Sequence, residues 1–269
     1  RKLLEGRAQV SLILDGSDAT VGATALSAAK LIGQAHSVKV LSEQAARQGR
    51  AAAVQPPLDV RTQIWYNPDL RSAYFMIPGV IGMVLFAILA MVTATAVVRE
   101  RERGTIEQLI VTPIRPWELI VGKITPFVIL GFFNLFEVLV IGHYWFGVPV
   151  RSNLFLVVGT AGLLLLSSLG IGLFASTVAN TQQEALLTVF MTILPSVFLS
   201  GFLFPLEAMP RVLQIISYAI PLRYYLVIVR SLLLKGVGFA ALQSEIISLA
   251  LFGIIIMTAA SLRFRKRLD

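Results

Sequence analysis

The chain has 269 residues, of which 56% are apolar and only 14% are charged, which is far from the composition of an ordinary soluble domain. Its net charge is +8, but the basic residues cluster at the ends of apolar runs and form no stripe interleaved with aromatic side chains. A nucleic-acid-binding protein is therefore not expected. The absence of cysteine excludes a disulfide framework and a thiol nucleophile. With only two histidines, His36 and His143, no metal centre is expected either.

Residues 1–74 are more polar than the rest and predict a partial extracytoplasmic α/β domain. Strands are predicted at about residues 10–14 and 58–66, where apolar and β-branched residues recur between turn-forming residues. Between these strands, Ser17 or Asp18 can cap an alanine-rich helix, and a second helical piece is predicted to follow it.

Residues 75–269 predict a transmembrane domain, so the fold class is a mainly α-helical, polytopic membrane protein with a small α/β segment. Its apolar runs match a hydrocarbon core of ~30 Å spanned at ~1.5 Å per residue. The five predicted spans are residues 75–98, 124–146, 154–178, 185–204 and 246–262. Residues 205–242 are interrupted by prolines into apolar pieces too short to cross, and they predict a re-entrant hairpin on the outer side.

Ser168, Gly172 and Ser176 recur at four-residue spacing in the third predicted span. Small residues at this spacing let two helices approach closely. Packing within the subunit and packing across a dimer are both consistent with the pattern, and we favour packing within the subunit.

Residues 99–123, called the polar island below, separate the first two predicted spans. The positive-inside rule places the island in the cytoplasm because it holds five basic residues: Arg99, Arg101, Arg103, Arg115 and Lys123. Residues 263–269 carry four more, which places the C-terminus on the same side. Residues 1–74 must then lie outside the cytoplasm, and we expect a further span before them in the intact protein.

Enzyme chemistry is poorly supported by the sequence. A phosphate-binding loop at Gly122-Lys123 would need a glycine where Trp117 stands and a Ser or Thr where Ile124 stands. The chain is therefore expected to bind no cofactor itself, and if transport through it is driven by ATP, the ATPase is another chain.

Two polar residues, Asn134 and Glu137, interrupt the second predicted span. A carboxylate in the hydrocarbon region is costly and is a functional candidate by default. Glu137 could take part in transport, or it could be a neutral side chain hydrogen-bonded to a neighbouring helix. One function that such a residue would suit is that of an ion-coupled secondary transporter or channel using Glu137. A purely structural membrane anchor is another.

The polar island resembles the characteristic loop of the ABC-2 family of exporter permeases, the membrane subunits of bacterial ABC exporters. The resemblance is carried by Glu102, Gly104, Thr105, Glu107, Leu109, Pro113, Gly122 and Lys123. Residues 14–18 and 65–70, followed by Pro78-Gly79, are similar to the multidrug-type branch of that family.

This resemblance implies six spans, of which the first is missing here, in a multi-pass protein of the bacterial inner membrane. It implies a partner ATPase dimer that binds ATP and magnesium, a second permease subunit, identical or different, and a periplasmic adaptor as a further partner. The implied function is export of a drug-like, lipid-like or other amphipathic substrate. The residues it implies in ATPase coupling are Glu102, Gly104, Thr105, Glu107, Leu109 and Pro113, with Gly104–Leu109 as a short docking helix.

Overall fold

The computed structural model describes residues 8–48, 58–104 and 116–265. The chain divides into two compact units, Arg1–Phe75 and Met76–Asp269. Most described residues are helical, and the one sheet among them has two strands, so the predicted fold class is confirmed.

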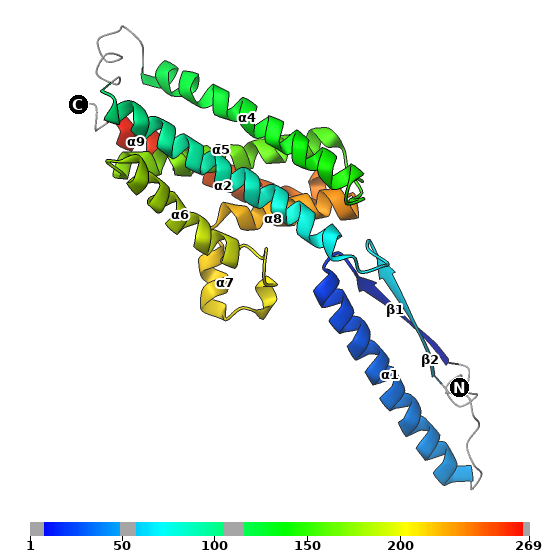
Figure 1. The fold of residues 1–269 in the computed structure, drawn as a ribbon. Coiled ribbons are helices and arrows are strands. Elements are labelled where there is room, and N and C mark those ends of the chain that lie inside the picture. The colour runs from blue at the N-terminus through cyan, green and yellow to red at the C-terminus, as the bar shows by residue number, and fades with distance from the viewer. Residues whose placement is uncertain (1–7, 49–57, 105–115, 266–269) are drawn as a thin grey trace. The chain divides into compact units, whose positions relative to one another are not determined.

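The first unit is a β-α-β arrangement (Figure 1). Strands β1 (Ala8–Asp15) and β2 (Leu58–Trp65) pair in parallel along all eight residues. Parallel neighbours need a long crossover, which the 30-residue helix α1 (Ala19–Gln48) provides. Of the two predicted caps it is Asp18 that caps α1, since its Oδ1 accepts the backbone N–H groups of Thr20 and Val21 at 2.9 and 3.1 Å.

The prediction of two helical pieces between the strands is wrong, because α1 is continuous. No glycine or proline interrupts residues 34–47, so the local sequence contains nothing that would break the helix there.

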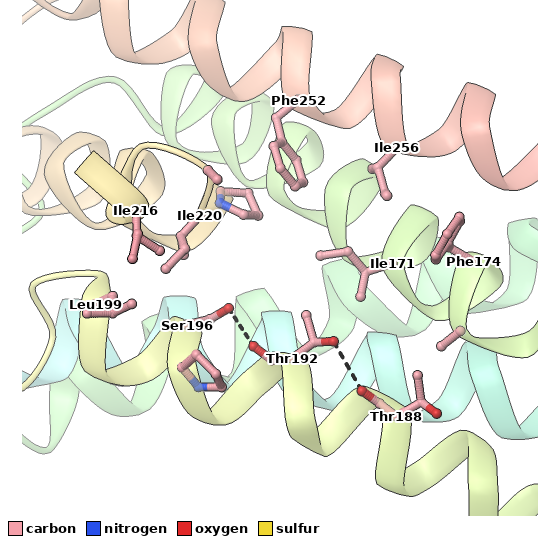
Figure 2. Close-up of a pocket in the computed structure, with 14 residues that line it drawn as sticks. Ile171, Phe174, Thr188, Thr192, Ser196, Leu199, Ile216, Ile220, Phe252 and Ile256 are labelled. Carbon is pink, nitrogen blue, oxygen red and sulfur yellow. Dashed lines mark hydrogen bonds between the residues drawn. The ribbon is translucent and has the colours of Figure 1, made fainter. Parts of the chain in front are cut away.

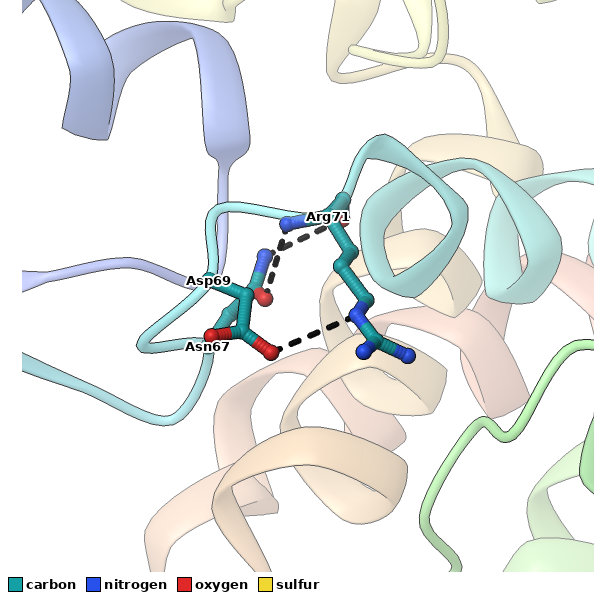
Figure 3. Close-up of polar contacts among 3 residues, drawn as sticks. All are labelled: Asn67, Asp69 and Arg71. Carbon is teal, nitrogen blue, oxygen red and sulfur yellow. Dashed lines mark hydrogen bonds and ion pairs between the residues drawn. The ribbon is translucent and has the colours of Figure 1, made fainter.

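The chain leaves β2 through a turn centred on Asn67, which is fully buried (Figure 3). Its side-chain amide donates to the backbone carbonyl of Arg71 at 3.0 Å and its Oδ1 accepts the Arg71 N–H at 2.9 Å. Tyr66 and Leu70 adopt positive φ angles of 71° and 50° on either side, which this pair of hydrogen bonds helps to hold. An exposed ion pair between Asp69 and Arg71, at 3.3 Å, completes the turn.

The second unit is a helical bundle. Within the described residues, five helices are long and apolar enough to cross a membrane, as predicted. They are α2 (Ser72–Glu102), α4 (Pro116–Tyr144), α5 (Leu154–Val178), α6 (Gln182–Leu199) and α9 (Gln243–Arg265).

Between α6 and α9 the chain forms short pieces rather than one span. These are a 3₁₀ turn (Leu206–Ala208), α7 (Arg211–Ser217), α8 (Pro221–Arg230) continued by a π turn (Ser231–Lys235), and a second 3₁₀ turn (Phe239–Leu242). The axis bends by 86° between α7 and the segment that begins at Pro221. This geometry fits either a broken span or a re-entrant segment, and the outer placement of the hairpin stays a prediction.

Helix α6 ends earlier than predicted. The predicted span runs to residue 204, but the helix ends at Leu199 and Gly201 takes a left-handed conformation with φ of 81°. The guanidinium of Arg230 donates to the Gly201 carbonyl at 3.0 Å, which ties the end of α8 to this turn.

Helix α5 lies at the centre of the bundle, and its small residues allow close packing on two sides. Ser168, Gly172 and Ser176 are all buried, and the Ser168 hydroxyl donates to the backbone carbonyl of Phe86 on α2 at 2.6 Å. A Cβ on Gly172 would lie 2.6 Å from the Ala90 carbonyl oxygen of α2, so only glycine fits there. The prediction that this stripe packs within the subunit is confirmed.

Helix α4 runs along the edge of the bundle (Figure 1). Only 11% of its most apolar 18-residue stretch is buried. It approaches its neighbours at Gly131, where a Cβ would lie 2.9 Å from side-chain atoms of Leu89 and Leu165. Its other faces carry exposed large side chains, among them Phe133 and Phe136.

Candidate functional site

The last turn of α2 carries the first residues of the polar island. The helix extends past the predicted end at residue 98 to Glu102, and Arg99 and Arg101 in this turn complement the negative end of the helix dipole. Gly104 then adopts φ of 70° and donates its N–H to the Arg101 carbonyl at 3.0 Å. No other atom lies within 4 Å of a Cβ built there, so glycine is favoured by the backbone conformation alone.

Three side chains join the end of α2 to the start of α6, and we call Arg99, Glu102 and Gln182 the polar clasp. The carboxylate of Glu102 accepts the backbone N–H of Gln182 at 2.9 Å and also accepts the Gln182 side-chain amide. The Nε of Arg99 donates to Oε1 of Gln182 at 3.0 Å. Each polar group of the Gln182 side chain is thus bonded to α2.

Thr181 and Glu184 cap the start of helix α6. Oγ1 of Thr181 accepts the Glu184 N–H at 3.2 Å, and the Glu184 carboxylate accepts the Asn180 N–H at 2.7 Å. Glu102 adds a second carboxylate at this helix start, where the dipole favours negative charge. Arg101 donates to the carbonyl of Ala179 at 3.1 Å, which fixes the preceding turn as well.

Four of the predicted coupling residues lie outside the described residues: Thr105, Glu107, Leu109 and Pro113. Glu102 and Gly104 lie at the end of α2, while Gly122 and Lys123 lie in the first turns of α4. The docking helix at Gly104–Leu109 therefore stays a prediction.

The intramembrane polar residues Asn134 and Glu137 both lie on α4. Asn134 is half-buried, whereas Glu137 is exposed beside Phe133 and Phe136. Glu137 is thus not enclosed between helices of this unit, in contrast to a carboxyl group buried against a neighbouring helix.

Sequence reasoning missed Gln182, whose clasp with Glu102 joins positions 80 residues apart. The only local signal was the capping pattern at Thr181, which marks a helix start but does not identify its partner. Within the described residues, no group of three or more His, Asp or Glu side chains could hold a metal ion.

The bundle of apolar helices, the bent segment before the last helix and the polar end of α2 together define a membrane-domain architecture. The model of the ABC-2 family of transporter proteins matches residues 2–262, which covers almost the whole chain. The chain belongs to the ABC-2 transporter family.

Three relatives come from Escherichia coli. The chain is 35% identical over 216 residues to YbhS and 31% identical over 260 residues to YbhR, both described as probable multidrug ABC transporter permeases. It is 32% identical over 216 residues to YhhJ, described as an inner membrane transport permease.

The matches to YbhS, YbhR and YhhJ cover 80%, 97% and 79% of this chain. They cover 57%, 68% and 57% of the relatives, so the chain spans roughly three fifths of the length of these permeases.

Proposed function

We propose that this chain forms most of the membrane-spanning permease subunit of an ATP-driven ABC-2 exporter. The observation that carries the proposal is the family match across residues 2–262. The multidrug descriptions of YbhS and YbhR support a drug-like, lipid-like or other amphipathic substrate that leaves the cytoplasm or the inner leaflet. ATP and magnesium would bind a separate ATPase dimer, and a second permease subunit would complete the pathway.

The contacts at the end of α2 support a route by which ATP hydrolysis in a partner could be coupled to movement of the membrane helices. The island residues between Gly104 and Pro116 join α2 directly to α4, and the polar clasp joins the end of α2 to α6. A push on the island by a partner would therefore act on three membrane helices at once. The charged side chains of the island suit a docking surface because they give specific, salt-sensitive complementarity to a partner.

The alternative function, an ion-coupled transporter using Glu137, has weaker support. Glu137 lies among aromatic neighbours on an exposed face of α4 with Asn134 one turn before it, and a proton relay across the membrane needs a longer series of polar groups. The family match favours the ATP-driven function.

The test is association with a partner ABC ATPase subunit, using the intact permease in membranes. Glu107→Lys reverses a charge that we expect to meet a basic residue of the partner, at a cost of ~2–5 kcal/mol if the pair is buried. Leu109→Ala removes an apolar anchor. Both should lower ATPase co-purification and permease-stimulated ATP turnover, whereas the control Arg267→Ala should not. Normal association and normal turnover in both island variants would overturn the coupling assignment.

A further inference from the structure

A cavity of about 420 Å³ lies inside the second unit (Figure 2), and none of the residues that line it belongs to the polar clasp. Its walls come from α5, α6, α9 and the bent segment that contains α7 and the start of α8. The size is within the range of sites that hold small molecules, and no part of the coupling proposal uses it.

The cavity has a buried floor and an open rim. Ile171, Ala175 and Ile220 at the floor are buried, whereas Thr192 and Ala219 at the rim are exposed. None of the lining residues carries a charge, and most are aliphatic or aromatic. The occupant must therefore be uncharged where it contacts the wall, because a buried charge without a partner is strongly disfavoured.

The polar groups on the wall are three hydroxyls one helical turn apart on α6, at Thr188, Thr192 and Ser196 (Figure 2). Each donates its proton to the carbonyl four residues earlier on its own helix, at 2.8, 3.1 and 2.7 Å respectively. The wall consequently has no hydroxyl proton to offer a ligand, and it does not specifically favour an anion or a polar head group.

We propose that this cavity binds one acyl chain of a membrane phospholipid. Most of the walls belong to helices that are long and apolar enough to cross a membrane. The open rim therefore faces hydrocarbon or another membrane segment rather than bulk water. An empty void would lose dispersion contacts along its whole lining, and water gains few hydrogen bonds from such a wall. An alkyl chain restores the contacts and requires no hydrogen-bond donor.

The experiment uses the intact permease in nanodiscs of phosphatidylethanolamine and phosphatidylglycerol. The probe is a phosphatidylethanolamine with a diazirine at the middle of one acyl chain, and mass spectrometry locates its adducts. Adducts on the cavity residues of α5, α6 and α9 should saturate with probe dose, because the site holds one chain. Adducts on the exposed face of α4 around Phe136 should rise without saturation, because bulk lipid reaches that face.

Two variants fill the cavity from its rim, Thr192→Trp and Ala219→Leu. Both should lower cavity labelling about tenfold, the effect of losing much of the apolar contact of one chain. The matched control is Met191→Trp, one residue from Thr192 on the same helix but outside the lining, and it should leave cavity labelling unchanged. An unchanged melting temperature in every variant shows that the fold is intact, and Ala219→Leu provides the test if Thr192→Trp does not fold.

Absence of cavity adducts in the unmodified protein would overturn the proposal, as would labelling that neither filling variant reduces. Labelling by a diazirine-bearing amphipathic amine but not by the phospholipid would also overturn it and would assign the cavity to a transported compound. The measurement needs no ATPase, so its outcome is independent of the coupling experiment.

Discussion

At the scale of single residues, Gln182 is the position where the structure adds most to the sequence. Its backbone N–H and both polar groups of its side chain bond to Glu102 or Arg99. Arg99 and Glu102 are exposed and Gln182 is half-buried, so the clasp contributes little to the stability of the bundle. Its geometric effect is to hold the end of α2 against the start of α6.

We predict that Gln182→Ala uncouples ATP turnover from export. The variant should fold, associate with the ATPase and hydrolyse ATP, but transport less substrate per ATP, because α6 no longer follows α2. Gln183→Ala, at the next position of the same helix, is the matched control and should behave as the unmodified protein. An unchanged ratio of transport to hydrolysis in Gln182→Ala would show that the clasp transmits nothing.

Glu137 gives a second prediction at this scale. A carboxylate exposed on a span is costly in hydrocarbon, so we expect this side chain to be neutral or covered in the assembled transporter. Glu137→Gln keeps the shape and a hydrogen-bonding end, and should therefore preserve assembly and ATP-driven export. Loss of export with normal assembly would favour a proton-relay role. The two outcomes are separated by measuring transport and complex formation on the same membranes.

At the scale of helices, the packing of α2 on α5 depends on Gly172. Gly172→Ala would place a Cβ 2.6 Å from a backbone oxygen of α2, which forces the helices apart. We expect a cost of about 1–3 kcal/mol, typical of overpacking, seen as a lower melting temperature in detergent. Gly159→Ala on the same helix is the control, since nothing lies within 4 Å of its added Cβ. Equal melting temperatures for the two variants would contradict the packing described here.

Much of the helical architecture could be predicted because it depends on local chemistry. The span at Leu154–Val178 is bounded as predicted, since a long apolar run follows Asn153, whose side chain caps the helix by accepting the Phe155 N–H at 2.9 Å. The start of α6 also depends on local chemistry, because the spacing of Thr181 and Glu184 is that of a helix cap.

Features that depend on tertiary contacts could not be predicted. The apolar run of α6 continues through Phe202 and Phe204, so hydropathy alone does not reveal that the chain turns at Gly201. The clasp joins residues far apart in sequence, and the exposure of Glu137 depends on which face of α4 meets α5. The cavity was missed too, although hydroxyls at Thr188, Thr192 and Ser196 marked one face of α6.

At the scale of the whole molecule, we predict the orientation across the membrane from the basic residues at the polar island and the C-terminus. The chain lacks cysteine, so single cysteines report topology without background. We predict that Arg103→Cys and Lys266→Cys are protected from an impermeant thiol reagent in intact cells, while Val38→Cys and Ser152→Cys are labelled. Val38 is chosen because it is 65% exposed, whereas the adjacent Ser37 is buried. Labelling at position 103 or 266 in intact cells would invert the orientation.

The central claim is that ATP hydrolysis by a partner, and not an ion gradient, drives transport through this family member. The most direct measurement uses inside-out vesicles that contain the permease and its partner ATPase, and it follows accumulation of a fluorescent amphipathic dye. We predict accumulation that requires ATP, that disappears in Glu107→Lys, and that persists when the proton gradient is collapsed. Accumulation driven by an imposed proton gradient without ATP, and lost in Glu137→Gln, would contradict the account.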